Sequence, residues 1–203
     1  MSDEPQITAA QVKALREETG AGMMDAKRAL VETGGDTEKA RDLLRTRGLA
    51  SAQKRSARAA SEGIIDAYIH GEGRIGVLVE VNCETDFVGR TEEFRRLARE
   101  VAMQVAALNP RWISRDDVPP DVIDGERKIY EERARGMGRP DKVIPQMVNG
   151  MLEAFYKETV LLDQEYVREH DKTIADLVTE VASKVGENVV IRRFVRFELG
   201  RES

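Results

Sequence analysis

The fold is decided by one alternating run, Ile75-Gly76-Val77-Leu78-Val79-Glu80-Val81. Its β-branched residues recur at every second position, which is typical of a strand with one face against a core. A second β-rich run, Ile64-Ile65-Asp66-Ala67-Tyr68-Ile69-His70, precedes it, and Gly71-Glu72-Gly73-Arg74 between the two is a turn signal. These stretches predict an antiparallel hairpin. We expect the odd-numbered residues of both strands to face the core.

A third strand is predicted near the other end of the chain, from Val189 to Leu199, where the odd positions are again mostly apolar. The sequence between the hairpin and this strand shows helical spacing of apolar residues. The expected helices run from Thr91 to Leu108, from Pro120 to Gly136, from about Asp141 to Phe155 and from Ile174 to Val185. We therefore expect an α+β core in which helices pack against a small three-stranded antiparallel sheet.

The segment up to Gly48 predicts three short helices. Thr8 and Gln11 fit a capping box at the start of the first helix, and Asp36 is a suitable N-cap for the third. Glycines mark the ends of the helices, at Gly20, Gly34 and Gly48. Three helices in so short a segment predict a bundle near the lower size limit for independent folding.

The next segment, from Leu49 to Ser61, is small and basic and has no sustained apolar stripe. We interpret it as a linker that is partly helical. A nucleic-acid contact is the alternative for its cations, but a short basic linker without aromatic residues is more often solvated. The expected organisation is a three-helix domain over residues 1–48, a basic linker over 49–61 and an α+β core over 62–203.

Composition narrows the class of protein. The chain has 203 residues, of which 41% are hydrophobic and 34% charged, and its net charge of −5 gives no global field that attracts nucleic acid or anionic membrane. Cys83 is the only cysteine, which excludes an internal disulfide framework. No apolar run reaches the roughly 18 residues of a membrane span, and the acidic segment Met1–Gln6 lacks a signal-peptide core. We expect a cytoplasmic protein that binds neither nucleic acid directly nor membrane.

No pattern in the sequence indicates an active site. His70 and His170 are far apart in the chain, and Cys83 has no histidine near it, so neither a nucleophilic pair nor a metal cluster is indicated. Gly71 and Gly73 lead into a strand instead of a helix, which does not fit a phosphate-binding loop. The sequence therefore predicts a protein that is not an enzyme, with no catalytic residue, metal or cofactor.

A candidate binding segment, Asn82-Cys83-Glu84-Thr85-Asp86-Phe87-Val88, follows the second strand. It places a carboxylate beside an aromatic residue in a connection, and connections often carry function. From the residues alone, Phe87 either packs on its own domain while Thr85 caps a turn, or enters a pocket on a partner. Met23 and Met24 are adjacent on a predicted helix and do not share a face, so we expect one to be buried and one exposed.

Three stretches of the chain resemble a known family. They are Leu15-Arg16-Glu17-Glu18-Thr19-Gly20-Ala21-Gly22-Met23-Met24-Asp25-Ala26-Lys27-Arg28-Ala29-Leu30, Val81-Asn82-Cys83-Glu84-Thr85-Asp86-Phe87-Val88 and Gly186-Glu187-Asn188-Val189-Val190-Ile191-Arg192-Arg193-Phe194. The first two closely resemble signatures of elongation factor Ts, and the third is also similar to it. The stretches follow that family's order and extend over nearly the whole chain. The sequence is thus similar to the short, single-core bacterial members.

The resemblance implies a guanine-nucleotide exchange factor for elongation factor Tu in translation elongation. Such a factor binds the GDP form, disturbs the Mg²⁺ and phosphate site and promotes GDP release so that GTP can rebind. The amino-terminal bundle is similar to ubiquitin-associated domains and is expected to dock on the GTPase. The implied docking residues are Arg16, Met23, Met24 and Lys27. The implied Mg²⁺-dislodging residues are Thr85, Asp86, Phe87 and Val88.

The resemblance also implies an oligomeric state. Short family members are expected to form a homodimer sheet against sheet, which makes residues 62–203 a dimerisation domain and gives a complex of two factors with two GTPases. The even-numbered sheet face needs a cover, and its apolar residues are Ile64, Tyr68, Leu78 and Phe194. Two other functions stay open, a ubiquitin-associated-like adaptor that uses only the bundle and an RNA-binding accessory role for the basic segment.

Overall fold

The computed structural model describes residues 7–201, so the acidic segment Met1–Gln6 lies outside the described residues. The described chain divides into two compact units. The first unit contains residues 7–64, 81–97 and 178–190, and the second contains residues 65–80, 98–177 and 191–201. The chain therefore passes several times between the two units, and some strands and helices contribute to both.

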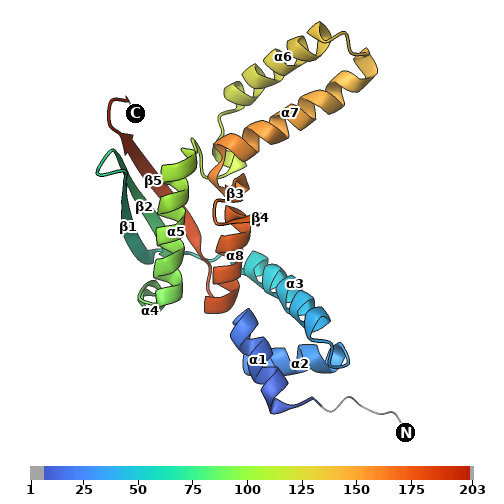
Figure 1. The fold of residues 1–203 in the computed structure, drawn as a ribbon, viewed down its shortest axis with the longest axis vertical. Coiled ribbons are helices and arrows are strands. Elements are labelled where there is room, and N and C mark those ends of the chain that lie inside the picture. Colours follow the sequence, from blue (N-terminus) through green and yellow to red (C-terminus); the bar gives the residue numbers. More distant parts are fainter. Residues whose placement is uncertain (1–6, 202–203) are drawn as a thin grey trace. The chain divides into compact units, whose positions relative to one another are not determined.

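The first unit begins with a bundle of α1 (Ala9–Thr19), α2 (Met23–Glu32) and α3 (Thr37–Arg55), shown in blue in Figure 1. The predicted capping box is present, because Thr8 Oγ1 accepts from the Gln11 amide at 3.2 Å and Gln11 Oε1 accepts from the Thr8 amide at 2.9 Å. The small apolar core of the bundle consists of Val12, Leu15, Ala26, Ala29, Leu30, Ala40 and Leu44. The predicted bundle of three helices is confirmed.

Helix α3 continues beyond Gly48 through the first half of the segment that we expected to be a partly helical linker. Arg55 donates through Nη2 to the carbonyl oxygen of Ala182 in α8 (Ile174–Val185) at 3.2 Å. A Cβ atom at Gly48 would collide with the hydroxyl of Ser183, so the glycine permits a close approach of α3 and α8. This part of the basic segment is a packed helix, and the domain boundaries at residues 48 and 61 stay a prediction.

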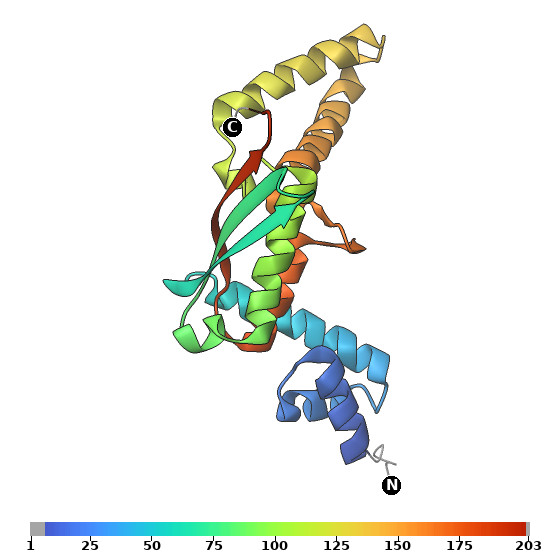
Figure 2. The same ribbon diagram turned by 60° about the vertical axis from the view of Figure 1, so that its left-hand side comes forward.

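The predicted three-stranded sheet is present within residues 7–201, in the order β1 (Glu62–His70), β2 (Ile75–Cys83) and β5 (Val190–Glu198). Figure 2 shows the three strands with α5 (Glu92–Leu108) running along them. In the second unit Arg99 of α5 donates to the carbonyl oxygen of Ala67, and Arg196 of β5 donates to the carbonyl oxygen of Ala106 in α5 at 3.3 Å. Helix α5 therefore covers one face of the sheet.

The expectation that odd positions face the core is correct for β2 and for Ile191 at the start of β5, and it is wrong for β1 and for the rest of β5. Val77 and Val79 are 2% and 1% exposed, whereas Ile65 and Phe197 are 66% and 60% exposed. When an antiparallel hairpin has an even number of loop residues, an odd position of one strand lies opposite an even position of the next. Accordingly Ile69 lies on the same face as Gly76, whose Cβ position is 3.4 Å from Ile69 Cδ1. The four-residue turn thus reverses the parity.

The second unit also contains a pair of helices, α6 (Pro120–Gly136) and α7 (Ile144–Thr159), that pack along each other (Figure 1). Their shared core consists of Ala134, Ile144, Val148 and Leu152. A short sheet of β3 (Glu165–Tyr166) and β4 (Glu169–Thr173), which the sequence did not predict, follows them.

The α+β class predicted from the sequence is confirmed, with helices beside a three-stranded sheet and a helical bundle near the amino terminus. No helix among residues 7–201 is long and apolar enough to cross a membrane.

Candidate protein-binding site

Phe87 lies on α4 (Asp86–Gly89), a single helical turn between β2 and α5, and its side chain is 78% exposed. The next two residues, Val88 and Gly89, are buried and fix the turn to the first unit. The carboxylate of Asp86 pairs with Arg90 four residues later at 2.7 Å. The turn therefore holds a large aromatic side chain in solvent beside a carboxylate whose charge is balanced by Arg90.

The turn rests on the backbone at Gly63. A Cβ atom at Gly89 would lie 3.4 Å from Gly63, so the two residues are in ordinary van der Waals contact. Gly63 has φ +139°, and a Cβ atom on it would lie 2.8 Å from Asn82 Cα, closer than real Cβ contacts allow. Because only glycine fits the backbone contact at Gly63, this residue is part of the support of the site, and Gly89 packs against it. Sequence reasoning missed both, and no local pattern marks them.

Cys83 is buried beneath the same turn. Its Sγ donates to the carbonyl oxygen of Thr85 at 3.1 Å, and the side chain is 0% exposed. Burial raises the pKa of the Cys83 thiol above its usual range, and the nearby Glu187 carboxylate raises it further. The thiol is therefore neutral near pH 7 and serves as a hydrogen-bond donor.

The predicted docking residues of the bundle are all exposed. Met23 and Met24 are 47% and 63% exposed, so the expectation that one of them is buried is wrong. The residues of α2 that are buried in the core of the bundle are Ala26, Ala29 and Leu30. Neither methionine lies on this face of the helix. Arg16 and Lys27 are exposed as well, and neither has an ion-pair partner among the described residues.

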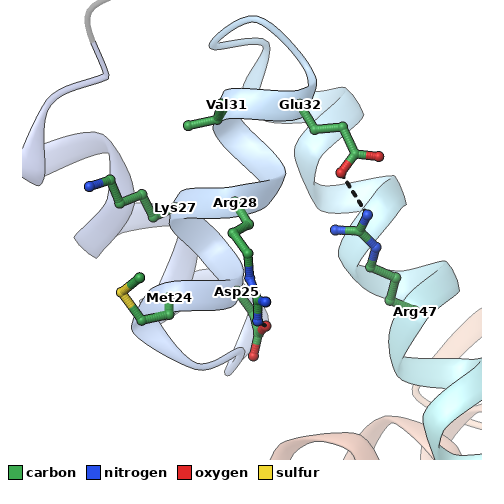
Figure 3. A pocket seen from close by; sticks show the side chains of 7 residues that line it. All are labelled: Met24, Asp25, Lys27, Arg28, Val31, Glu32 and Arg47. Atoms are coloured by element: carbon green, nitrogen blue, oxygen red, sulfur yellow. Dashed lines mark hydrogen bonds and ion pairs between the residues drawn. The ribbon is translucent and has the colours of Figure 1, made fainter.

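Figure 3 shows that Met24, Lys27 and Val31 of α2 point to the same side of the helix. A shallow depression on this surface is lined by Met24, Asp25, Lys27, Arg28, Val31, Glu32 and Arg47. Arg28 pairs with Asp25, and Arg47 of α3 pairs with Glu32 at 2.6 Å. Within residues 7–201, Lys27 of this apolar patch has no ion-pair partner, and paired charges border the patch. Such a surface is suited to a partner that offers apolar side chains and a carboxylate.

The bundle and the Phe87 turn belong to the same compact unit, and Lys184 of α8 lies between them. Its side chain passes over Gly20, where a Cβ atom would lie 2.6 Å from Lys184 Cγ. Its ammonium group pairs with Glu180 at 2.8 Å and with Glu93, at the start of α5, at 3.6 Å. The two exposed surfaces are thus parts of one packed unit.

The four residues predicted for a dimer face do not lie on the same face of the sheet. Ile64, Tyr68 and Phe194 are half-buried, and Tyr68 lies under the Arg99 guanidinium of α5 at 5.2 Å, on the covered face. Leu78 alone of the four lies on the open face and is 47% exposed. The large apolar residues of that open face are Ile65, Ile69, Leu78, Val195, Phe197 and Leu199. The cause is the reversed parity of β1 and β5.

No cluster of histidine, cysteine and carboxylate side chains suited to a metal ion occurs in the described part of the chain. By its fold and these surfaces the chain is of the class of α+β proteins that expose apolar and charged side chains on a helical bundle and on a single helical turn. Comparison with known proteins makes the class specific. The family model described as Elongation factor TS matches residues 38–201. The chain belongs to the elongation factor Ts family.

Individual relatives match over nearly their full length. A protein of Caldanaerobacter subterraneus subsp. tengcongensis named Elongation factor Ts is 58% identical over 194 residues, which is 96% of this chain and 97% of the relative. Proteins of the same name from Carboxydothermus hydrogenoformans and Coprothermobacter proteolyticus are 57% and 54% identical, over 96% of this chain and 89% and 99% of their own lengths. The resemblance noted for the signature stretches thus extends over the chain.

Proposed function

We propose that this chain is a guanine-nucleotide exchange factor for elongation factor Tu in translation elongation. The factor binds the GDP form, loosens the nucleotide and lets GTP rebind. The observation that carries the proposal is the 78% exposed Phe87 on a turn that the first unit fixes firmly. A rigid aromatic residue that the described part of the chain leaves exposed is suited to a pocket on another protein.

The Thr85–Val88 segment acts as a wedge beside the nucleotide site of the partner. GDP is held largely through its phosphates and a bridging Mg²⁺, so a displacement of the loops near the metal weakens binding without contact to the nucleotide. Burial of Phe87 in a pocket on the partner contributes about 2 kcal/mol to the complex. Asp86 adds negative charge close to the metal once its exposed pair with Arg90, at 2.7 Å, is exchanged for a contact to the partner.

The bundle supplies the docking surface. Met23 and Met24 offer flexible apolar side chains, which adapt to an irregular surface. Arg16 and Lys27 offer cations to a carboxylate on the GTPase, and charges of this kind guide the encounter of two proteins. The wedge then performs the exchange. The factor changes no covalent bond, needs no cofactor and is therefore not an enzyme in its own right.

The open face of the sheet is the surface for a homodimer. Its large apolar side chains form one exposed patch, which is unusual for a protein that stays monomeric. Two copies packed through this face place the wedges on separate subunits, which gives a complex of two factors with two GTPases. The assembly is cytoplasmic, and residues 62–203 form its α+β core and dimerisation domain.

The direct test is the release of fluorescent GDP from elongation factor Tu after addition of a catalytic amount of this protein. An exchange factor accelerates release, and excess free GDP weakens the factor's own binding, because coupling between the two ligands is reciprocal. No acceleration by the wild-type protein at any concentration would contradict the proposal and leave an adaptor role for the bundle.

A further inference from the structure

Glu187 is the residue that joins the wedge to the end of α8. It follows Gly186, which ends that helix with φ 75°. Glu187 Oε2 accepts hydrogen bonds from the amides of Glu84 and Thr85, each at 3.0 Å. Its Oε1 accepts from the Thr85 hydroxyl at 2.6 Å. One carboxylate therefore fixes two successive backbone amides and a side chain immediately before Phe87.

A second set of hydrogen bonds connects Glu84, just before the wedge, to the residue that follows Glu187. The Asn188 amide donates to Glu84 Oε1 at 2.6 Å, and Arg58 lies 3.5 Å from the same oxygen. The buried Asn188 side chain donates to the carbonyl oxygens of Ser56 and Arg58 at 3.2 and 2.8 Å, just beyond the end of α3. Three segments that are distant in the sequence thus meet in one hydrogen-bonded cluster.

The wedge needs this external support because it is too short to be stable by itself. Helix α4 has four residues, and its N-cap, Thr85, makes no side-chain capping bond to the helix. A single helical turn in water is strongly unfavourable, since nucleation orders several residues for one hydrogen bond. Hydrogen bonds from amides and a hydroxyl to an ionised carboxylate are stronger than neutral ones and fix direction as well as distance.

We propose that Glu187 is a positioning residue for nucleotide exchange, which holds Thr85 so that Phe87 is presented in one conformation before the partner binds. The inference rests on the proposed function. Glu187 reaches the wedge through Thr85 and Glu84 and need not touch the GTPase. Because the bundle supplies the docking contacts and the wedge acts after docking, an ordered wedge lowers the conformational entropy that is lost in the step that loosens GDP. The effect of Glu187 is therefore expected mainly in the rate of GDP release at saturating factor and less in the half-saturating concentration.

The test uses the full-length Glu187→Gln variant, which keeps the shape of the side chain but removes the charge and one acceptor. Its matched control is Glu72→Gln, which removes the same charge from an exposed residue of the hairpin turn. Hydrogen exchange of the Glu84 and Thr85 amides is measured by NMR in the free proteins. We expect the exchange of both amides to rise about tenfold in Glu187→Gln and to stay unchanged in the control.

The same proteins are then tested in GDP release from elongation factor Tu over a range of factor concentrations. The maximal release rate of Glu187→Gln is expected to fall about tenfold, with the half-saturating concentration changed less than about twofold. Thr85→Val removes only the hydroxyl contact at an exposed position and is expected to show a smaller loss of the same kind. Combined with Glu187→Gln it should add little, because both changes remove one interaction.

Two failures are distinguishable in this design. Unchanged amide exchange in Glu187→Gln, or faster exchange with an unchanged maximal release rate, would overturn the positioning role while the proposed function stands. A wild-type protein that does not accelerate GDP release would overturn the proposed function and the role built on it. If Glu187→Gln does not fold, Thr85→Val decides through the exchange of the Glu84 and Thr85 amides. Its release rate alone does not separate the two roles, because Thr85 is itself part of the wedge.

Discussion

Gly63 shows how a single residue can determine the position of the wedge. Its φ of +139° and its contact with Gly89 bring the start of β1 against the Phe87 turn. Neither property has a local sequence signal, because both depend on a neighbour that lies far along the chain. The residue type of Phe87 alone likewise did not predict whether its side chain is packed or exposed. The family resemblance favoured an exposed side chain.

We expect Gly63→Ala to destabilise the protein by about 2–4 kcal/mol, since the new Cβ atom meets backbone atoms and the φ value is strained for any L-residue. Urea unfolding measures the change. Gly125→Ala in α6 is the matched control, because nothing lies within 4 Å of its Cβ position, and it should stabilise by up to about 1 kcal/mol. Equal stability of Gly63→Ala and the wild type would show that the close contact does not exist.

The Cys83 thiol predicts a pH dependence. Its pKa in the folded protein is raised, chiefly by burial, so folding favours the protonated form. Its contribution to stability is therefore complete below the unfolded-state pKa, near 9, and is lost as the pH rises through the higher folded value. In urea unfolding measured from about pH 7 to about pH 10, the wild type should lose more stability than Cys83→Ala. Other groups titrate alike in both proteins, so parallel curves would contradict this origin.

The periodicity of apolar residues predicted where most helices and strands lie, but it did not predict which face of each strand is buried. The alternation in β1 and β5 was visible. For β1, the parity that the four-residue turn imposes decided which side is covered, and in β5 the buried positions change from odd to even after Ile191. The sheet of β3 and β4 was missed because its strands are short and Glu169–Thr173 is almost entirely polar. Contacts such as those of Glu187 join elements about a hundred residues apart, beyond the reach of pattern reasoning.

Arg115 in η1 (Arg115–Asp117) fixes the base of the α6 and α7 pair. It donates to both carboxylate oxygens of Glu153 at 2.9 and 2.8 Å and to Asp163 at 2.7 Å, and it stacks over Tyr156 at 4.5 Å. Arg115→Lys loses the forked geometry and the stacking. Because Arg115 is partly exposed, we expect a loss of only about 1 kcal/mol in urea unfolding. Arg135→Lys, whose contact to Glu131 is 3.4 Å, serves as the control and should change little.

In the molecule as a whole, the wedge and the open sheet face require different kinds of contact. The wedge needs a rigid support within the first unit, and the apolar residues of the open face need a cover. A second copy of the chain meets the latter need without a further partner. The sequence indicated that an uncovered face exists, although the residues named for it were mostly those of the covered side.

Phe197→Glu tests this assembly, because it places a charge within the proposed dimer interface. Light scattering of the wild type at micromolar concentration should give the mass of a dimer, and the variant should give the mass of a monomer. Ile129→Glu adds the same charge at a residue of α6 that is 57% exposed and should remain dimeric. A wild-type monomer would contradict the proposed homodimer.

The maximal rate of fluorescent GDP release from elongation factor Tu shows whether Phe87 drives nucleotide exchange. Loss of about 2 kcal/mol of burial predicts a maximal rate for Phe87→Ala that is lower by roughly tenfold or more. Ile129→Ala, a truncation of an exposed side chain on α6, should match the wild type. A Phe87→Ala variant that accelerates GDP release as fast as the wild-type protein at saturation would contradict the account.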